Sequence, residues 1–479
     1  MTDANTPLFV DLDGTLLNSD MLLESLVCLL RRNPAYLLLL PWWLLKGRAH
    51  LKAQIADRVS VRVDLLPYNK QFLEFLQQEK DAGRTLILLS ASTQRLVSQI
   101  AEHLPLFDQA IGSTAADNLK GGAKLRKIQA LVGDRPFNYA GNDKSDLAVW
   151  DRSEHAVVVN ASAALSAELA QHSPVARNFP PAPGHGRALL RALRPHQWLK
   201  NGLLFLPLLL AHKFSDLPSF IFVVHAFIAF CLCASSVYLL NDLLDLEADR
   251  QHESKSLRPF AAGELSIAWG LSLSPLLLLT AFFIALTVGL EFTLVLACYY
   301  LLTLLYNFGL KSLVIVDVLV LAALYTLRII AGAAAIHVLP TFWLLAFSMF
   351  LFMSLAIVKR VTELDNLRAL SRDQAAGRGY VAADLGVLSM LGITSGFISV
   401  LVFALYINAE DTRVLYGTPE ILWFICPLLL YLVSRIWLLA HRGQLHEDPL
   451  VFAATDRRSQ FVVVLCALLV WAAIGQWFS

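Results

Sequence analysis

The feature that most constrains the fold is a series of long, uncharged, apolar stretches in the second part of the chain. The stretch from 220 to 240 has about twenty uncharged residues, enough for a helix to cross a bilayer. Hydrophobic residues make up 56% of the chain and charged ones only 16%, against about a quarter in ordinary proteins. We therefore predict an all-α bundle of nine transmembrane helices, at about 197–213, 218–240, 265–288, 291–309, 312–336, 340–358, 385–408, 419–440 and 460–478.

The cations between these stretches predict how the bundle is oriented. With the N-terminus inside, the outer loops hold only Lys213 and Arg413. The inner loops hold many more, namely Arg250, Lys255, Arg258, Lys311, Lys359, Arg360, Arg368, Arg372, Arg378, Arg442, Arg457 and Arg458. This asymmetry predicts cytosolic loops after the second and sixth helices and an outer C-terminus, in a bacterial-type inner (cytoplasmic) membrane. The net charge of +1 gives no reason to expect a nucleic-acid partner, and the sequence leaves homo-oligomers open.

The first 172 residues have a different pattern, with short apolar strands alternating with helical stretches. The start of the chain lacks a basic-then-apolar signal pattern, so this domain is expected in the cytosol. Strands alternating with helices predict an α/β domain with a parallel sheet, whose site lies at the carboxyl ends of the strands. Prolines and glycines over 173–193 predict a linker, so the bundle domain is expected over 194–479.

Four short motifs follow one another in this first domain. The strand Leu8-Phe9-Val10 runs into Asp11-Leu-Asp13-Gly-Thr, and a later strand ends at Ser90. Lys124 precedes an amphipathic helix, and a further strand leads into Gly-Asn142-Asp143-Lys-Ser-Asp146. In this order the motifs resemble those of haloacid dehalogenase-type phosphatases, which have a Rossmann-like sheet.

This resemblance implies a role for each motif residue. Asp11 would attack phosphorus, and Asp13 would act as general acid and base. Ser90 and Lys124 would hold phosphoryl oxygens. Mg²⁺ would be bound by side-chain oxygens of the first and last motifs, namely those of Asp11, Asp13, Asn142, Asp143 and Asp146. Because Asn142 occupies the first acidic position of the usual last motif, the choice between Asn142 and Asp143 as ligand stays open.

About seventy residues separate the first motif from Ser90, enough for a helical cap over the site. Within them, the uncharged segment 33–45 is too short to span a bilayer. Trp42 and Trp43, followed by Lys46, suit a membrane interface. The alternative is a helix buried within the cap.

An acidic motif follows the second predicted membrane helix. Asn241, Asp242, Asp245 and Asp249 recur at three- and four-residue intervals, so a continuing helix would place them on one face. Closely spaced carboxylates repel one another unless a cation lies among them, and hard oxygen ligands suit Mg²⁺. A solvated acidic helix end is the alternative. N-D-x-x-D-x-x-x-D at the end of a membrane helix resembles the first aspartate-rich motif of the UbiA-type membrane prenyltransferase superfamily, whose members share the nine-helix plan.

Further polar residues lie within or beside the predicted membrane helices. Asp317, Tyr325 and Arg328 fall near one side of the fifth helix, and intramembrane ionisable residues usually face a cavity; a structural ion pair is the alternative. The others are expected near the cytosolic surface, where cations also anchor helices at lipid headgroups. We predict that Lys200, Lys359, Arg360 and Arg328 position substrate phosphates. All the substrate-binding residues that we predict are Arg194, Lys200, Asn201, Lys255, Arg258, Asp317, Tyr325, Arg328, Lys359, Arg360 and Glu363.

The region after the sixth helix indicates a branch of the superfamily. Aromatic prenyltransferases carry a second aspartate-rich motif there, whereas this chain has Lys359-Arg360-x-x-Glu363-x-Asp365. This pattern, with Arg194-Pro-x-Gln-Trp-x-Lys200-Asn201, is similar to the polyprenyl-phosphate (decaprenyl-phosphate type) phosphoribosyltransferases. The resemblance implies phosphoribosyl diphosphate as donor and a membrane-embedded polyprenyl phosphate as acceptor. The first domain would then remove the 5-phosphate of the product. The alternatives are prenylation of an aromatic acceptor, with the phosphatase acting on a separate substrate, and a membrane scaffold or transporter without chemistry.

Overall fold

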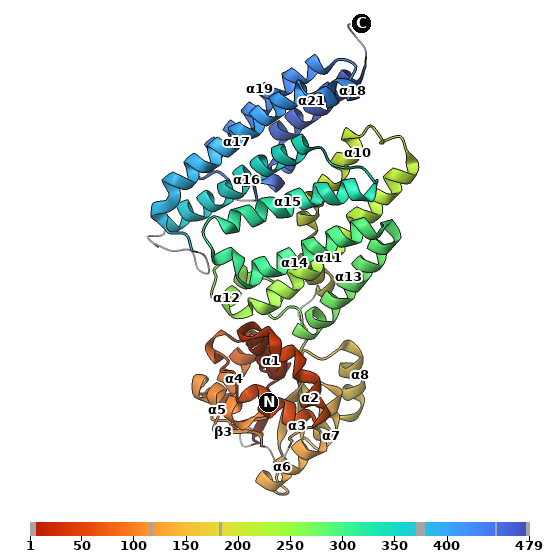
Figure 1. The fold of residues 1–479 in the computed structure, drawn as a ribbon. Helices are drawn as coiled ribbons and strands as arrows, with labels where there is room; N and C mark the ends of the chain where they lie inside the picture. Colours follow the sequence, from red (N-terminus) through yellow and green to blue (C-terminus); the bar gives the residue numbers. More distant parts are fainter. Residues whose placement is uncertain (1–5, 115–117, 182–183, 370–378, 446–447, 476–479) are drawn as a thin grey trace. The chain divides into compact units, whose positions relative to one another are not determined.

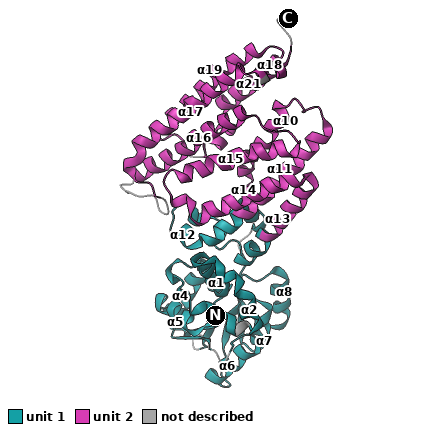
Figure 2. Ribbon diagram, viewed as in Figure 1, with its two compact units in different colours: residues 1–193, 238–274 teal, residues 194–237, 275–479 magenta. Residues whose placement is uncertain are grey.

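The computed structural model describes residues 6–114, 118–181, 184–369, 379–445 and 448–475. Arg372 and Arg378, which enter the orientation argument, lie outside these ranges. The chain forms two compact units, one of residues 1–193 with 238–274 and one of residues 194–237 with 275–479 (Figure 2). The division falls within two helices, α11 (Leu217–Leu244) and α13 (Ile267–Val288).

The first unit contains a six-stranded parallel sheet with the strand order β3-β2-β1-β4-β5-β6, which confirms the predicted α/β class. Because β1 lies between β2 and β4, the chain changes direction across the sheet at β1. The carboxyl end of such a strand is where α/β proteins form their sites, and Asp11 follows directly. The strands are β1 (Leu8–Val10), β2 (Leu86–Thr93), β3 (Gln109–Ser113), β4 (Asn138–Gly141), β5 (His155–Val159) and β6 (Val175–Phe179).

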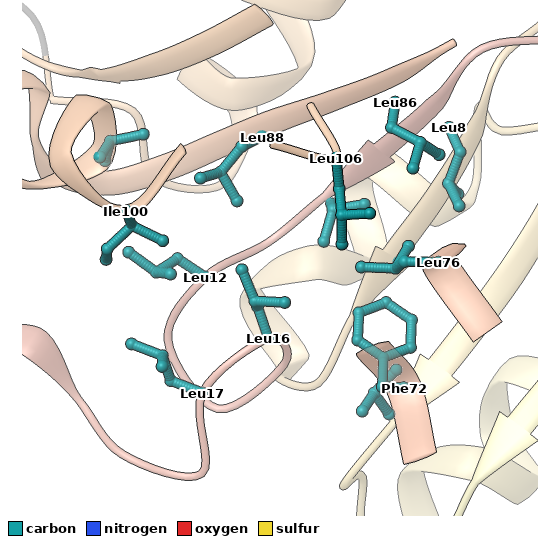
Figure 3. Close-up of a cluster of buried hydrophobic side chains, with 14 of the residues drawn as sticks. Leu8, Leu12, Leu16, Leu17, Phe72, Leu76, Leu86, Leu88, Ile100 and Leu106 are labelled. Atoms are coloured by element: carbon teal, nitrogen blue, oxygen red, sulfur yellow. The ribbon is translucent and has the colours of Figure 1, made fainter. Parts of the chain in front are cut away.

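Hydrophobic layers cover both faces of this sheet. Successive strand residues point to opposite faces, and accordingly Leu8 and Val10 join one layer while Phe9 joins the other. Figure 3 shows the first layer, where Phe72 and Ile100 pack with the leucines of β1 and β2. The sheet helices are α4 (Lys70–Asp81), α5 (Gln94–His103), α6 (Gly122–Val132), α7 (Leu147–Trp150), after the 3₁₀ helix η3 (Lys144–Asp146), and α8 (Ala163–His172).

The insert between the first motif and β2 is helical, as predicted for the cap. Its tryptophans lie in different environments: Trp43 packs with Leu29 and Ile55, whereas Trp42 is 61% exposed. The segment 33–45 therefore has both a buried side and an exposed apolar side, and each sequence interpretation describes only one of them. The elements of the insert are α1 (Met21–Arg32), η1 (Pro34–Leu38), α2 (Leu40–Leu45), α3 (Arg48–Ala56) and η2 (Val63–Leu65).

The segment predicted as a linker over 173–193 contains regular structure. Val175–Phe179 forms β6, which pairs with β5 at the edge of the sheet, and His185–Leu193 forms α9. Pro174, Pro180 and Pro181 lie just outside β6, and Gly184 and Gly186 lie at the start of α9, so these residues mark the ends of the two elements rather than a continuous coil. The linker prediction was wrong for these residues.

The aspartate-rich motif belongs to the first unit. The helix α11 ends at Leu244, and α12 (Leu246–Arg250) begins after Asp245, whose backbone φ of −97° marks the break. The 3₁₀ helix η5 (Lys255–Leu257) and the start of α13 complete this part of the unit. The four polar motif residues therefore do not lie along one uninterrupted helix.

The second unit is the predicted helical membrane bundle (Figure 1). Within the described residues, eight helices are long and apolar enough to cross a membrane. The remaining predicted span, 197–213, consists of the 3₁₀ helix η4 (Pro195–Phe205) and the short α10 (Leu206–Leu210). Pro207 lies in the first turn of α10, where a missing backbone N–H is tolerated.

Within the bundle, η4 lies closely against α15, where Leu204 packs in the same buried cluster as Ala331 and Ala335. A Cβ atom at Gly332 would lie 2.1 Å from the Leu204 carbonyl oxygen, so this approach requires glycine. Besides the helices given above, the bundle contains α14 (Leu290–Phe308), η6 (Leu310–Ser312), α15 (Val316–Ala335), α16 (Phe342–Ala369), η7 (Ala382–Asp384), α17 (Leu385–Ile407), α18 (Glu410–Leu415), η8 (Pro419–Phe424), α19 (Ile425–His441), α20 (Pro449–Thr455) and α21 (Arg457–Ile474).

Candidate active sites

The first motif and Lys124 meet at the carboxyl end of β1. The Lys124 Nζ atom lies 2.9 Å from Asp11 Oδ1 and 3.4 Å from Asp146 Oδ1. It also donates to the Tyr139 hydroxyl at 2.7 Å. Lys124 is itself buried, so its ammonium is held among two carboxylates and a phenol. The structure thus brings together three of the predicted residues, from the end of β1, from α6 and from η3.

Asp13 is held by hydrogen bonds from two directions. Its Oδ1 atom accepts from the Met21 backbone N–H at 2.8 Å. Its Oδ2 atom accepts from the Ser92 hydroxyl at 2.8 Å and from the predicted Ser90 at 3.4 Å. Ser92 was not among the predicted site residues. Its place two residues after Ser90, on the same side of a strand, was the available signal.

Burial shifts the proton affinities of both carboxyls. Burial raises the pKa of Asp11 to about 7, although Lys124 acts in the opposite direction. Burial and the charge of Asp20 raise the pKa of Asp13 to about 6. A carboxyl that titrates close to neutral pH suits Asp13 to exchange protons with a leaving group and with water.

The predicted metal ligands divide into two groups. Asp11, Asp13, Asn142 and Asp143 line a cavity of about 450 Å³. Asp146 is not among its lining residues; its Oδ2 atom accepts from the backbone N–H groups of Asn142, at 3.1 Å, and Asp143, at 3.2 Å. Asp146 therefore shapes the loop that presents the other two residues.

The donor atoms around this cavity fit Mg²⁺ chemically. They are carboxylate and amide oxygens, which hard divalent cations prefer. In the part of the chain that the structure describes, no three His, Cys, Asp or Glu side chains are arranged to enclose a metal. An ion that binds through a few carboxylates and keeps water or phosphate oxygens suits such a site, and Mg²⁺ binds in this way.

In the aspartate-rich motif, two carboxylates converge on one arginine. The Arg258 Nη1 atom lies 2.6 Å from Asp249 Oδ2 and 3.2 Å from Asp242 Oδ1, and both aspartates are buried. Burial raises the pKa of Asp249 against the opposing charge of Arg258. Asn241 and Asp245 are half-buried, and Lys255 is exposed. The buried pair and Arg258 form a compact charged centre that differs from a solvated helix end.

A second polar centre lies within the bundle, and we call it the bundle cluster. The Lys200 Nζ atom lies 2.6 Å from Asp448 Oδ2, and Lys359 Nζ lies 3.5 Å from the same oxygen. The Tyr325 hydroxyl donates to both oxygens of Asp448, at 3.1 and 3.2 Å. The members of the bundle cluster are Lys200, Asn201, Tyr325, Arg328, Lys359 and Asp448.

Asp448, which the sequence interpretation missed, is the common partner in this cluster. Burial alone would raise its pKa, but Lys200 and Lys359 outweigh burial and hold the pKa at about 2. The carboxylate also caps α20 by accepting from the Leu450 backbone N–H. The Asp448-Pro449 sequence, typical of a helix start, was its only signal.

Arg328 joins the same cluster through its own hydrogen bonds. Its Nε atom donates to Asn201 Oδ1 at 2.9 Å, and its Nη2 atom donates to the Tyr299 hydroxyl at 2.9 Å. The guanidinium also lies 5.5 Å from the centre of the Tyr325 ring. The predicted residues Lys200, Asn201 and Arg328 are therefore neighbours, although 127 positions separate Asn201 from Arg328.

Asp317 and Arg360 form a separate buried ion pair. Arg360 also donates to the Tyr306 hydroxyl, at 2.9 Å, and to Glu363, at 2.6 Å. Asp317 has no exposed surface and Arg360 only 1%. Asp317 thus pairs with α16 rather than with Arg328 on its own helix. Arg194 lies outside both groups, immediately before η4, with a left-handed backbone φ of 53°.

Two family patterns match the chain. The UbiA prenyltransferase family matches residues 203–454, and the haloacid dehalogenase-like hydrolases match residues 8–149. A chain from Archaeoglobus fulgidus, described as a UbiA homolog bound to GPP and Mg²⁺, is similar at 17% identity and a TM-score of 0.47. The comparison covers 60% of this chain and 99% of that one.

Curated relatives are similar over one or both parts. Protein y4nM of Sinorhizobium fredii is 38% identical over 97% of this chain and 90% of its own length. Nodulation protein NoeC of Azorhizobium caulinodans is 36% identical over 58% of this chain and 90% of its own. A decaprenyl-phosphate phosphoribosyltransferase of Mycolicibacterium smegmatis is 28% identical over 60% of this chain and 92% of its own. The chain is an integral membrane enzyme that belongs to the UbiA prenyltransferase family and carries a haloacid dehalogenase-like hydrolase domain at its N-terminus.

Proposed function

We propose that the bundle transfers 5-phosphoribose from phosphoribosyl diphosphate to a polyprenyl phosphate. The N-terminal domain then removes the 5-phosphate from the lipid-linked product. The observation that carries the transfer step is the bundle cluster, in which Lys200 and Lys359 converge on one carboxylate beside Arg328. Such a concentration of cations, of which Lys200 and Arg328 are buried, suits a phosphate-bearing acceptor. The similarity to a decaprenyl-phosphate phosphoribosyltransferase supports the same donor and acceptor.

The aspartate-rich segment would bind the donor. Asp242 and Asp249, with Asn241 and Asp245, would hold Mg²⁺ against the diphosphate. A bound Mg²⁺ would neutralise charge on the diphosphate and, in the N-terminal site, on the phosphate ester. Arg258 already lies against both buried carboxylates, so it is placed to share the diphosphate oxygens.

The bundle cluster would bind the acceptor. Lys200 and Lys359 would hold the polyprenyl phosphate, and an oxygen of that phosphate would attack carbon 1 of the ribose. The new bond joins this oxygen to carbon 1, while the bond from carbon 1 to the diphosphate breaks and pyrophosphate leaves. Asp448 would keep the two lysines oriented, since both ammonium groups lie within 3.5 Å of its Oδ2 atom.

The N-terminal site would then hydrolyse the 5-phosphate ester. Asp11 attacks phosphorus while Asp13 protonates the leaving ribose oxygen. Asp13 next deprotonates a water that releases inorganic phosphate from Asp11. Lys124, 2.9 Å from Asp11, stabilises the charge on the phosphoryl oxygens, and the buried Ser90 assists. We propose that this domain faces the cytosol and that the C-terminus lies outside, as the positions of the loop cations indicate.

Radiolabelled phosphoribosyl diphosphate tests the transfer step. Membranes that contain the protein, supplied with the labelled donor and polyprenyl phosphate, should yield a labelled lipid. The Asp242→Asn variant serves as the negative control. Prenylation of a hydroxybenzoate by the same membranes, with no label in the lipid, would contradict the proposal.

A further inference from the structure

The second half of the aspartate-rich motif and the residues after it pack against the hydrolase domain within the first unit. We call residues 245–266 the docking segment. Its central contact joins Arg250 to Glu24 of α1: Nη2 lies 2.7 Å from Oε1, and Nη1 lies 3.0 Å from Oε2. The side chains are only 9% and 5% exposed. This is a buried, two-pronged ion pair, the geometry in which arginine and carboxylate recognise each other most specifically.

Arg250 and Glu24 each form a further hydrogen bond within their own part of the unit. The Arg250 Nε atom donates to the Ala261 carbonyl at 3.2 Å, within the docking segment. Glu24 accepts from the Ser19 hydroxyl at 2.6 Å, and the Ser19 carbonyl accepts from the Gly14 N–H at 3.2 Å. Hydrogen bonds therefore connect Arg250, through Glu24 and Ser19, to the loop that carries Asp13.

Two further residues of the docking segment approach the hydrolase site. Gly263 has a φ of +72°, and a Cβ atom there would lie 2.8 Å from Asn18 and 3.0 Å from Pro67. Ser266 lines the same cavity of about 450 Å³ as Asp11 and Asp13. The docking segment, which joins two membrane helices, therefore forms part of the wall of the hydrolase cavity.

A buried ion pair is a costly way to hold two surfaces together. Both charges must leave water, and apolar residues of similar size often stabilise a contact as well. The pair does, however, fix the relative position of the two surfaces, because only one arrangement allows both hydrogen bonds between the Arg250 guanidinium and the Glu24 carboxylate. Arg191 and Glu264 form a second, exposed ion pair between α9 and the docking segment, which increases the contact area without burying charge.

We propose that the Glu24–Arg250 pair is an anchor that docks the hydrolase domain on the aspartate-rich segment, so that the hydrolase acts on the ester made by the same molecule. This inference rests on the proposed function, since it concerns transfer of a lipid-linked phosphate ester between the two sites. Glu24 and Arg250 do not line the hydrolase cavity. Substitution of either residue should therefore leave the hydrolysis reaction unchanged and impair only the passage of the lipid-linked phosphate ester to the hydrolase site.

Three variants of the full-length protein test the delivery step. In Glu24→Gln and Arg250→Gln, hydrolysis of p-nitrophenyl phosphate should stay within about twofold of wild type, while the 5-phosphorylated lipid accumulates about tenfold or more as effective concentration is lost. The charge-reversed double variant Glu24→Arg/Arg250→Glu should restore the wild-type lipid ratio at least in part. Unchanged lipid ratios in both single variants would overturn the proposal.

Cys28 provides a readout that does not depend on either reaction. It is half-buried in α1 and lines a small cavity together with Leu246 and Glu247 of the docking segment. Maleimide labelling of Cys28, followed by peptide mass spectrometry, should be about tenfold faster in Glu24→Gln, because undocking exposes the thiol. The matched control is Lys80→Gln, which removes an exposed ion pair with Asp108 in the same domain.

The two readouts separate the docking inference from the proposed function. If wild type makes no phosphoribosyl lipid, the proposed function fails, and Cys28 labelling still tests docking. If labelling of Glu24→Gln equals that of wild type and of Lys80→Gln, the docking inference fails whichever lipid is made. The Arg250→Lys variant, which keeps the charge but loses the fork, should label at an intermediate rate.

Discussion

The hydrolase site and the bundle cluster are opposite in charge. In the hydrolase site one buried cation, Lys124, lies against Asp11 and Asp146. In the bundle cluster one carboxylate, Asp448, lies against Lys200 and Lys359. An excess of carboxylates calls for a divalent cation before it can receive a phosphate. An excess of ammonium groups can receive a phosphate directly. We expect the first site to depend on Mg²⁺ and the second to bind its substrate by its own charge.

The largest expected effect comes from removing the hydrolase nucleophile. Asp11→Asn keeps the shape of the side chain but cannot form an aspartyl phosphate. Hydrolysis of p-nitrophenyl phosphate should fall about a thousandfold or more, while incorporation of labelled phosphoribose into lipid is unchanged. A parallel loss of both activities would show that the two sites are not chemically separate.

The next largest effect is expected in the aspartate-rich segment. Asp249→Asn removes a charge that now lies 2.6 Å from Arg258. The transfer rate should fall about a hundredfold, and raising Mg²⁺ should recover part of it. Transfer assays over a Mg²⁺ series check this expectation, with Asp245→Asn as the half-buried comparison. Full transfer activity in Asp249→Asn would remove the metal hypothesis for this segment.

A substitution of Lys200 tests the expectation that the bundle cluster binds a phosphate by its own positive charge. Lys200→Gln should raise KM for polyprenyl phosphate about tenfold to thirtyfold, because one charge-assisted contact to its phosphate is lost. The KM for phosphoribosyl diphosphate should stay close to wild type, since the donor is assigned to the aspartate-rich segment. Steady-state kinetics with each substrate varied in turn separate the two. Lys200→Arg, which keeps the charge, should recover most of the affinity.

A smaller effect is expected when the counterion of the cluster is neutralised. Asp448→Asn leaves Lys200 and Lys359 facing each other without a carboxylate, so the ammonium groups should be less well positioned. We expect a drop of about fivefold in kcat with little change in KM. Asp448→Glu should recover part of the rate. An equal loss in both variants, together with lower thermal stability, would assign Asp448 a purely structural role.

The smallest effect is expected at Lys255. This residue follows the aspartate-rich motif but is exposed, and an exposed charge is screened by solvent and salt. Lys255→Gln should change transfer by less than about twofold. A tenfold loss would mean that Lys255 approaches the donor during the reaction.

Local sequence patterns predicted the features that depend on near neighbours in the chain. The strand before Asp11, the parallel sheet and the membrane helices follow from apolar patterning, and both family resemblances are confirmed. Helical spacing placed Asp317 and Arg328 near one side of α15. It could not show that Asp317 pairs with Arg360 of α16, because spacing identifies a face but not the element that packs on it.

The features that the sequence did not reveal depend on contacts between distant segments. Asp448 meets Lys200 across 248 positions, and no local pattern marks such a partner. Glu24 meets Arg250 across 226 positions. The strand β6 was missed because the prolines at its two ends outweighed a short segment of mixed polarity.

The most direct test of sequential action is the mass of the lipid product. Full-length wild-type protein, given phosphoribosyl diphosphate and polyprenyl phosphate, should accumulate polyprenyl-phosphoryl-ribose. The Asp11→Asn variant should accumulate the same lipid heavier by one phosphate group, because transfer continues and hydrolysis stops. Identical product masses from the two proteins would contradict hydrolysis by the N-terminal domain, and absence of a ribose-bearing lipid from both would contradict the transfer.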